Sequence, residues 1–503
     1  MNPECAANTV ADLLARGVPD EPVFLSARSA RCLSRADLRE AAQAWRSALD
    51  RAGLPPGGRV AVVVDDPLTL AAVHLAVMAA GRCSVPLDPG APGPELERAL
   101  RRTGVAVLVA DDEAAARLPG VPRARPDRRG RPGVVPTASG PLVPGGPLAV
   151  PSGAGTLLST SGSTGEPKGV LLGEGRLLHV ARAVAAHLEL TPDDRGLTPL
   201  PLFHVNAQVV GLLATLHAGS SLVLDRRFRR TDFWERARAH DVTWLNLVPA
   251  ILTVLAREED PPAVPPRLRL IRSASAPLPV AVRDAVEART GVGVLESYGM
   301  TEAASQITAV PLGVACPPGS VGRPAGAEVA VRGAGGTALA PGTRGRVWIR
   351  GAGVVDAYEG GRAPERFDAG WLDTGDVGHL DDAGFLHLAG RDDDVINRGG
   401  ELLHPREVEE VLLGDERVAE AVVVGLPHDV LGAVPVACVR AVGSEDPDDF
   451  DDPGLARDLD ARCRAQLSRW KCPVQVLVLT DLPRGSTGKV RRSDVRELVA
   501  TTP

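Results

Sequence analysis

The stretch LLSTSGSTGEPKGV, residues 157–170, contains a run of glycine, serine and threonine at 160–165 that ends shortly before Lys168. Glycine lets the backbone approach a ligand closely, and hydroxyl and backbone N–H groups can converge on an oxyanion. The run follows a short apolar segment and precedes a helical pattern at 176–190. This composition predicts a loop that holds phosphate groups.

Two common nucleotide-binding loops do not fit this stretch. A Walker A loop reads Gly, four residues, then Gly-Lys-Ser or Gly-Lys-Thr, whereas Pro167 stands five positions after Gly162 and Gly169 follows Lys168. The dinucleotide pattern G-x-G-x-x-G does not occur in the chain. The loop is therefore a phosphate-type loop of another family.

Lysine is scarce in this protein. Of 56 lysines and arginines together, lysine occupies only positions 168, 471 and 489. Lysine carries a compact ammonium group on a flexible stem, a shape that the planar guanidinium of arginine cannot imitate. A position that keeps lysine is therefore a candidate site. A codon bias that left three lysines by chance explains the scarcity equally well from composition alone.

Composition limits the class of protein. At 503 residues the chain is too long for one ordinary core, and a net charge of −7 gives no broad basic surface for nucleic acid. The seven cysteines are scattered without a C-x-x-C pair, which favours reduced thiols over a zinc site or disulfides. We find no signal peptide and no apolar run of about 20 residues. We expect a cytoplasmic protein with neither nucleic-acid nor membrane partners.

Strand and helix patterns alternate along the chain. The segment 34–53 has helical spacing with Ser34 as cap and Gly53 as stop, and 59–64 is a buried-strand run. This order predicts a parallel, helix-covered sheet. From about residue 319 the strands become glycine-punctuated, and a compact α+β pattern follows residue 394.

Several further segments, taken together with the loop, resemble the AMP-forming adenylating enzymes, which include acyl-CoA synthetases, carrier-protein adenylation domains and beetle luciferases. The matching segments occur in the family's order over nearly the whole chain. They are STSGSTGEPKGV (159–170), PLFHVNAQ (201–208), SASAPLP (273–279), ESYGMTEAA (296–304), GWLDTGDVG (370–378), GRDDDVINRGGELLHPREVE (390–409) and LPRGSTGKVRR (482–492).

The resemblance implies an α/β fold in two parts. Residues 1–391 would form a large ATP- and acid-binding domain of helix-covered sheets, in which 318–391 is a β-rich subdomain. Residues 392–503 would form a small, mobile α+β domain that carries the catalytic Lys489. The hinge falls on Asp393, although the DDD triplet allows an error of one residue and a simple charged turn remains the alternative.

The resemblance also implies the chemistry, in which a carboxylate and ATP give an acyl-adenylate and pyrophosphate, and a thiol then attacks. Tyr298 would stack on adenine, Asp376 rather than its neighbour Asp373 would bind the ribose, and Glu302 would bind Mg²⁺. An ordinary core tyrosine and a solvated carboxylate are the alternatives for Tyr298 and Glu302. The full set expected to contact ATP or AMP is Thr160, Ser161, Gly162, Ser163, Thr164, Gly165, Lys168, Ser275, Ala276, Pro277, Glu296, Ser297, Tyr298, Gly299, Thr301, Asp376, Arg391 and Lys489.

Catalysis and acid binding are implied in the same way. Lys489 would bridge the acid and the α-phosphate, Thr301 would contact that phosphate, and His204 would act as a gate beside the reacting carboxylate unless it is a satisfied core histidine. The expected acid-binding residues are His204, Asn206, Gln208, Ser273 and Gly299. After adenylation, Arg398, Gly399 and Gly400 would line a tunnel for the thiol.

The substrate is the least determined feature. The segments 201–208 and 273–279 are most similar to oxalyl-CoA-synthetase-like ligases, and their polar side chains favour a small or polar acid, unless they only bond the backbone. No arginine is evident for a second carboxylate, so oxalate is not named. CoA is the expected acceptor; the alternatives are a carrier protein, an amine, or activation of an unusual acid such as nitrite in secondary metabolism. A non-catalytic scaffold would be expected to lose Lys489 or Asp376, and both are present.

Overall fold

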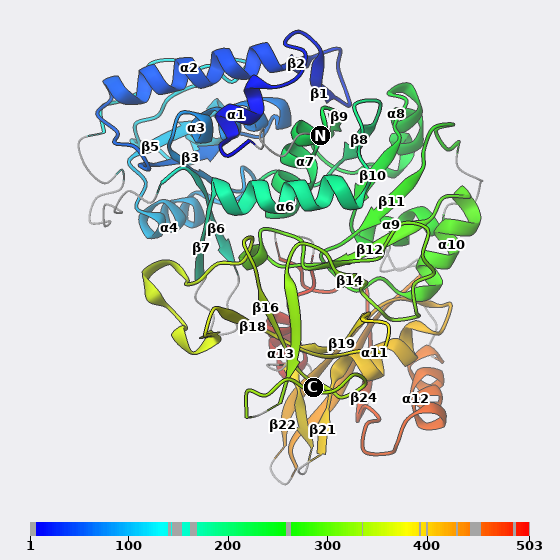
Figure 1. The fold of residues 1–503 in the computed structure, drawn as a ribbon. Coiled ribbons are helices and arrows are strands. Elements are labelled where there is room, and N and C mark those ends of the chain that lie inside the picture. The colour runs from blue at the N-terminus through cyan, green and yellow to red at the C-terminus, as the bar shows by residue number, and fades with distance from the viewer. Residues whose placement is uncertain are drawn as a thin grey trace.

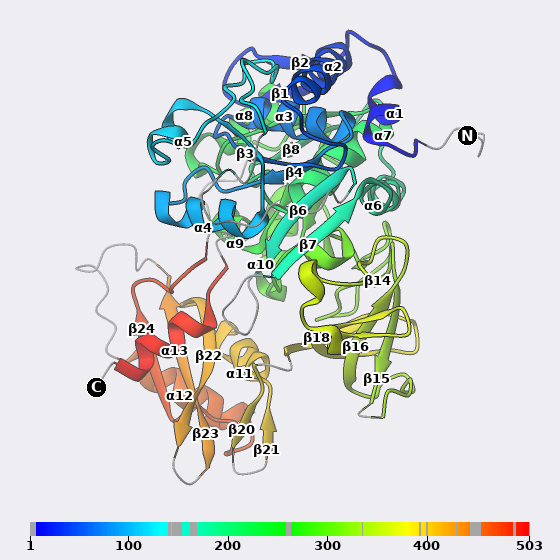
Figure 2. The same ribbon diagram turned by 90° about the vertical axis from the view of Figure 1, so that its left-hand side faces the viewer.

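The computed structural model shows a larger N-terminal part and a smaller C-terminal part that meet along one side (Figures 1 and 2). It describes residues 7–138, 142, 153–160, 168–257, 263–333, 335–391, 394–398, 401–428, 431–442, 454–485 and 489–501. The α/β architecture agrees with the expectation from sequence. The exact boundary at 391/392 and the start of the β-rich subdomain at 318 stay predictions.

A five-stranded sheet in the order β5-β3-β4-β6-β7 contains the apolar strands of the first half. Its strands are β3 (Arg59–Val63), β4 (Cys83–Pro86), β5 (Val107–Ala110), β6 (Gly155–Thr160) and β7 (Lys168–Gly173). Strands β3, β4, β5 and β6 are parallel, which confirms the predicted parallel sheet. The helix α3 (Pro67–Ala79) is buried along nearly its whole length.

The helix expected at 34–53 is α2 (Arg35–Arg51), and its start confirms the predicted cap. The Ser34 side chain accepts from the Asp37 N–H while the Asp37 carboxylate accepts from the Ser34 N–H, which satisfies two donors that a helix start leaves unpaired. The accompanying helices of this part are α1 (Val10–Ala15), α4 (Gly93–Thr103) and α5 (Asp112–Ala116).

One strand was not expected. Lys168 begins β7, which pairs antiparallel with β6, so that the glycine-serine run joins two strands of a hairpin and does not lead directly into a helix. The helix α6 (Glu174–His187) starts only after β7.

A nine-stranded sheet in the order β14-β13-β12-β11-β10-β8-β9-β1-β2 forms the second core layer. Its strands are β1 (Pro22–Ser26), β2 (Cys32–Ser34), β8 (Arg195–Thr198), β9 (Ser221–Leu224), β10 (Trp244–Leu247), β11 (Leu270–Ser273), β12 (Val294–Tyr298), β13 (Thr308–Ala309) and β14 (Arg323–Pro324). The strands from β12 to β1 are parallel, so their carboxyl ends share one edge, where open α/β sheets bind ligands. The helices packed on this sheet are η2 (Ala207–Leu213), α7 (Ala214–Ala218), α8 (Phe233–Ala239), α9 (Pro249–Ala256) and α10 (Val280–Thr290).

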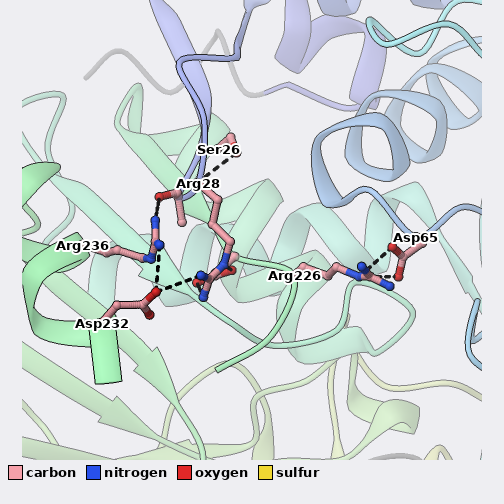
Figure 3. Close-up of polar contacts among 8 residues, drawn as sticks. Ser26, Arg28, Asp65, Arg226, Asp232 and Arg236 are labelled. Atoms are coloured by element: carbon pink, nitrogen blue, oxygen red, sulfur yellow. Dashed lines mark hydrogen bonds and ion pairs between the residues drawn. The ribbon is translucent and has the colours of Figure 1, made fainter. Parts of the chain in front are cut away.

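An arginine-carboxylate cluster ties the edge of this sheet together (Figure 3). Arg28, just after β1, binds both oxygens of Asp225 at 2.7 and 2.8 Å and reaches Asp232 at 3.0 Å. Arg236 on α8 binds the same Asp232 carboxylate at 2.8 Å. The bonds from Arg236 and Arg28 hold the pKa of Asp232 at about 2. Bidentate geometry fixes the direction of each side chain, so the cluster orients β1 against α8.

The glycine-punctuated segment forms the third sheet, and residues after 394 form the fourth. The third contains β15 (Glu328–Arg332), β16 (Gly345–Arg350), β17 (Phe367–Asp368), β18 (Trp371–Leu380) and β19 (Leu386–Arg391). The fourth contains β20 (Ile396–Arg398), β21 (Glu401–Leu403), β22 (Val418–His428), β23 (Gly432–Ala441) and β24 (Gln475–Leu479), with helices α11 (Pro405–Leu413), α12 (Leu455–Gln466) and α13 (Arg492–Thr501). None of the helices within the described ranges is both long and apolar enough to cross a bilayer.

Candidate active site

The turn after β12 carries the YGMTE segment and is sterically fixed. A Cβ atom on Gly299 would lie 1.4 Å from the Ser305 carbonyl oxygen, so only glycine fits this position. Ala304 and Ser305 adopt φ values of +50° and +101°, which side-chain-bearing residues rarely adopt. Backbone strain of this kind persists where the surroundings enforce it, and it is common at ligand sites. The turn therefore holds Tyr298 on one side and Thr301 and Glu302 on the other in fixed positions.

Tyr298 and Asp376 are joined by a hydrogen bond from the tyrosine hydroxyl to the carboxylate Oδ2. Asp376 pairs with Arg391 across β18 and β19, and Arg391 Nη1 lies 3.6 Å from Asp376 Oδ1. Burial raises the pKa of the Asp376 carboxyl, with Arg391 acting in the opposite direction, and also raises that of the Tyr298 hydroxyl. The structure thus brings together the three residues that the sequence linked to the nucleoside.

Asp373, the alternative ribose-binding residue, is engaged in a different way. Its Oδ2 accepts from Arg346 at 2.8 Å, and its Oδ1 accepts from the Gly375 N–H at 2.9 Å. These contacts hold the turn that presents Asp376.

Glu302 lies close to a tyrosine that the sequence reading did not single out. The Tyr358 hydroxyl donates to Glu302 Oε1 at 2.8 Å, and the two residues are buried, at 2% and 5% exposed. Lys168 places its ammonium 5.0 Å from the centre of the Tyr358 ring. Tyr358 therefore connects the phosphate-loop lysine to the expected metal ligand. The only sequence signal was that it is one of two tyrosines in the chain.

The carboxylate of Glu302 is suited to Mg²⁺. Among the described residues no other hydrogen bond to this carboxylate is formed, so Oε2 keeps its lone pairs. No cluster of three or more potential metal ligands occurs in the described ranges. Mg²⁺ commonly binds through one or two carboxylates together with substrate phosphates, and Glu302 beside Lys168 fits that pattern.

Ser275, Ala276 and Pro277 follow β11 and form the turn expected beside adenine. Ser275 has a φ of +80°, and its hydroxyl accepts a hydrogen bond from Asn206 Nδ2 at 3.2 Å. This bond joins the expected nucleotide turn to the expected acid-binding segment.

His204 precedes η2 and Gln208 lies in its first turn; η2 is a π-helix, and such helices are frequent at functional sites. Burial, and to a smaller degree the Lys489 charge, lower the pKa of His204 to about 4, and its Nε2 is shielded without a hydrogen-bond partner among the described residues. Gln208 donates to the Leu202 carbonyl at 2.9 Å, while its Oε1 and the Ser273 hydroxyl have no partner within the described part of the chain. His204 is therefore neutral near pH 7.

Lys489 comes from the C-terminal part and reaches the nucleoside-binding residues. The residue is exposed overall, but burial of its ammonium group lowers the pKa of Lys489. The charge of Asp376 counteracts this shift, and the charge of Arg391 adds to it. Its charge also acts on His204. Lys489 is therefore within electrostatic range of Asp376, Arg391 and His204.

Some expected residues cannot be placed or lie elsewhere. Arg398 donates to the carbonyls of Trp470 and Cys472 at 2.7 and 3.1 Å, within its own part of the chain. The following expected residues lie outside the described ones: Ser161, Gly162, Ser163, Thr164, Gly165, Asp393, Gly399 and Gly400.

A fold of this order, with a lysine that follows the last strand of the smaller part and lies within electrostatic range of a carboxylate of the larger part, is that of adenylate-forming enzymes. The profile of the AMP-binding enzyme family matches residues 13–359, and that of its C-terminal domain matches 407–489. The chain therefore belongs to the AMP-binding enzyme family, which confirms the resemblance seen in its sequence.

Individual relatives agree with this result. The chain is 35% identical to the sulfoacetate–CoA ligase of Cupriavidus necator over 94% of both proteins. It is 35% identical to the oxalate–CoA ligase of Arabidopsis thaliana, over 69% of this chain and 68% of that one. The o-succinylbenzoate CoA synthetase of Bacillus subtilis, solved with its acyl-adenylate intermediate, is 26% identical with a TM-score of 0.81, over 97% of this chain and 98% of the other.

We predict that Tyr358→Phe weakens magnesium-dependent nucleotide binding. The change removes the hydroxyl that orients the Glu302 carboxylate and keeps the ring beneath Lys168. A hydrogen bond to a charged group contributes about 1.5–3 kcal/mol, so the Mg²⁺ concentration for half-maximal ATP binding should rise roughly tenfold. Calorimetric titration of ATP at fixed Mg²⁺ levels measures this, with ATP binding without the metal as control; an unchanged Mg²⁺ requirement would contradict the role.

We also predict a pH-dependent stability change for Glu296→Gln. Burial raises the pKa of Glu296 to about 7 from 4.5, against the opposing effect of Arg283, which lies 3.7 Å away. Because the folded-state pKa lies above the ordinary value, ionised Glu296 costs stability, and that cost grows as the pH rises from about 4.5 to about 7. The variant should thus gain roughly 1–3 kcal/mol relative to the unmodified protein at pH 8 and little at pH 4.5.

Thermal unfolding of both proteins between pH 4.5 and 8 tests the Glu296 prediction. Glu328→Gln is the control, because the bond from Arg350 lowers the pKa of Glu328 and its pH trend should have the opposite sign. A gain in stability from Glu296→Gln that falls as the pH rises would contradict the prediction, because it would show that the ionised carboxylate stabilises the fold.

Proposed function

We propose that this protein activates a small, polar carboxylic acid with ATP and Mg²⁺ and transfers the acyl group to CoA. In the first half-reaction the carboxylate attacks the α-phosphate, which gives an acyl-adenylate and pyrophosphate. In the second the CoA thiol attacks the acyl carbon, loses its proton and releases AMP. The observation that carries this proposal is that Lys489 of the C-terminal part is within electrostatic range of Asp376, Arg391 and His204.

The cations of the site act on the charges of the first half-reaction. Lys489 lies where it offsets the repulsion between the acid and the α-phosphate, which favours the transition state over the separated reactants. Lys168 holds the phosphates that leave as pyrophosphate. When bound, Mg²⁺ neutralises phosphate charge, and Glu302, oriented by Tyr358, holds it. His204 is neutral at pH 7, so as the gate it would add no charge beside the reacting carboxylate.

The contacts between the two parts of the chain suit a movement between half-reactions. Glu407 on α11 accepts from Arg344 of the third sheet at 3.1 Å and also pairs with Lys471. Arg257 donates to the Val418 carbonyl at 3.5 Å. Exposed ion pairs contribute roughly 0–1 kcal/mol, so these contacts break at low cost. Rotation about the predicted hinge at Asp393 would exchange Lys489 for the Arg398–Gly400 loop.

The proposed acid and acceptor are supported by the polar residues of the expected acid-binding segment and by the activities of the relatives. The relatives named above are CoA ligases of sulfoacetate, oxalate and o-succinylbenzoate, and polar Asn206 and Gln208 lie in the expected acid-binding segment. A cytoplasmic location accords with the need for ATP and CoA. A carrier protein or an amine is the alternative acceptor.

Product analysis tests the proposal. A panel of small acids with ATP and Mg²⁺, with and without CoA, should release pyrophosphate, and mass spectrometry should detect acyl-AMP and, with CoA, acyl-CoA. An acyl-AMP that does not react with CoA would show that the acceptor is a molecule other than CoA. Absence of pyrophosphate release with every acid would contradict the activation step.

Lys489→Ala should abolish acyl-adenylate formation while ATP still binds, because the remaining nucleotide contacts are intact. The loss expected from removing a positioned charge at a developing negative charge is about 10²–10³-fold. Pyrophosphate release and ATP titration separate the two effects. Lys471→Ala, which removes the partner of Glu407, is the matched lysine control. A Lys489 variant that retains most of its adenylation rate would rule out this role.

A further inference from the structure

Arg272 on β11 is the most deeply buried arginine among the described residues, at 2% exposed. Its Nη1 donates to Asn246 Oδ1 at 3.0 Å and to Asn206 Oδ1 at 3.4 Å. Asn246 Nδ2 in turn donates to Asn206 Oδ1 at 3.1 Å. We call Asn206, Asn246 and Arg272 the amide-arginine cluster. It joins β10, β11 and the start of η2.

The cluster leaves most of the guanidinium without acceptors. Arg272 Nε is shielded from solvent and has no partner, and Nη2 makes no hydrogen bond, within the described part of the chain. The acceptors present are neutral amide oxygens. The charge of Arg272 also acts on His187, a base whose pKa is lowered mainly by burial.

The other buried arginines of the described chain donate through their terminal nitrogens to carboxylates or carbonyls, although Arg59 Nε and Arg82 Nε also have no partner there. Arg59 pairs with the Glu359 carboxylate at 2.5 Å, and Arg82 pairs with Asp50 at 2.5 Å. Arg35 uses both terminal nitrogens on the carbonyls of Leu13 and Leu216 at 3.0 and 2.7 Å. A buried charge is costly unless it is paired. Among the described residues neither Arg272 nor Arg35 has an acidic partner, and Arg272 differs from Arg35 in that it donates through one terminal nitrogen only.

Arg272 is linked to the expected acid-binding segment through Asn206. Asn206 bonds both Arg272 and Ser275, and it follows His204 by two residues. The cluster therefore lies between the expected gate for the reacting carboxylate and the nucleotide turn. Burial lowers the pKa of Arg272 to about 9, which leaves it cationic at pH 7.

We propose that the amide-arginine cluster binds a second anionic group, a carboxylate or a sulfonate, on the acid that is activated. The planar guanidinium pairs with such oxyanions through two parallel hydrogen bonds, and Nε with Nη2 is the pair of donors left for this purpose. Asn206 and Asn246 fix the plane of the guanidinium through Nη1. The acid is thus a short dianion, held at one end by Arg272 and activated at the other. This inference rests on the proposed function.

The test compares acids that differ only in the second charge. The pairs are malonate with malonamate, succinate with succinamate, and 3-sulfopropanoate with 3-(methylsulfonyl)propanoate. In at least one pair, kcat/KM for pyrophosphate release should favour the dianion by roughly 100-fold in the unmodified enzyme. Arg272→Gln should remove that preference while it keeps or improves turnover of the matched monoanion. Arg35→Gln, at a buried arginine with satisfied contacts, should lower stability and leave the preference intact.

Stability gives a second readout. Arg272→Met should leave the ligand-free melting temperature unchanged or raise it, because it removes a buried charge without an acidic partner, and it should abolish stabilisation by added malonate or succinate. A purely structural Arg272 would instead lower the melting temperature of the variant.

The outcomes separate this inference from the proposed function. Pyrophosphate release that favours the monoanions, or a dianion preference that survives Arg272→Gln, overturns the role of Arg272 and leaves acid activation in place. No pyrophosphate release with any acid, in an enzyme that binds ATP, overturns the proposed function itself. The unmodified enzyme alone decides the charge preference if the variants fail to fold.

Discussion

The contact between the backbone of Gly299 and the carbonyl of Ser305 is the constraint on which the site depends. A backbone that passes this close to a carbonyl cannot shift along β12 or unwind the following turn, so the segments before and after it keep one relative position. Tyr298 then meets Asp376 of the third sheet, and Glu302 meets Tyr358 of the loop beyond β16. Two separate sheets are thereby joined through one turn, and Lys489, between β24 and α13, is within electrostatic range of Asp376 at the point where they meet.

Charge is distributed unevenly across this arrangement. Most buried cations of the larger part are paired with acids or carbonyls and serve the fold. In the region where ATP and the acid would be bound, Lys168 lies over an aromatic ring, Arg272 contacts neutral amides, and Lys489 is within electrostatic range of Asp376. Such a region attracts anions, and it holds them in a setting of reduced dielectric where each contact is stronger than in water.

Much of the fold could be predicted from local pattern. Ser34 predicted the start of α2, because a capping box is a signal contained within four residues, and the apolar run at 59–64 formed the parallel strand β3 as expected. The strand β7 was missed because its six residues begin directly at the loop and end at a glycine, so the pattern resembled the approach to α6. The motif around Lys489 could be recognised from its residues alone. The position of this lysine near Asp376 could not, because it depends on how the two parts of the chain meet.

The residues that were missed share a physical reason. Tyr358 acts through Glu302, 56 positions away, and nothing in its own surroundings distinguishes it from a core aromatic. Arg272 occupies an apolar strand, and its partner Asn246 comes from the neighbouring strand in a register set by the crossover between them. Sequence periodicity shows that a strand is buried, but it does not show which side chains the next strand brings opposite.

The placement of the three lysines affects which side chains a reactive acyl-adenylate could modify. An acyl-adenylate is a mixed anhydride, and any molecule that escapes the cleft acylates amines that it meets. Lys168 lies over an aromatic ring, Lys471 is tied to a carboxylate, and Lys489 would be at the site while the adenylate forms. Every other lysine-or-arginine position holds an arginine, which stays protonated and does not act as a nucleophile. The protein thus presents few side-chain amines to a leaking intermediate, and damage by acylation would concentrate on Lys489, where it would stop further production.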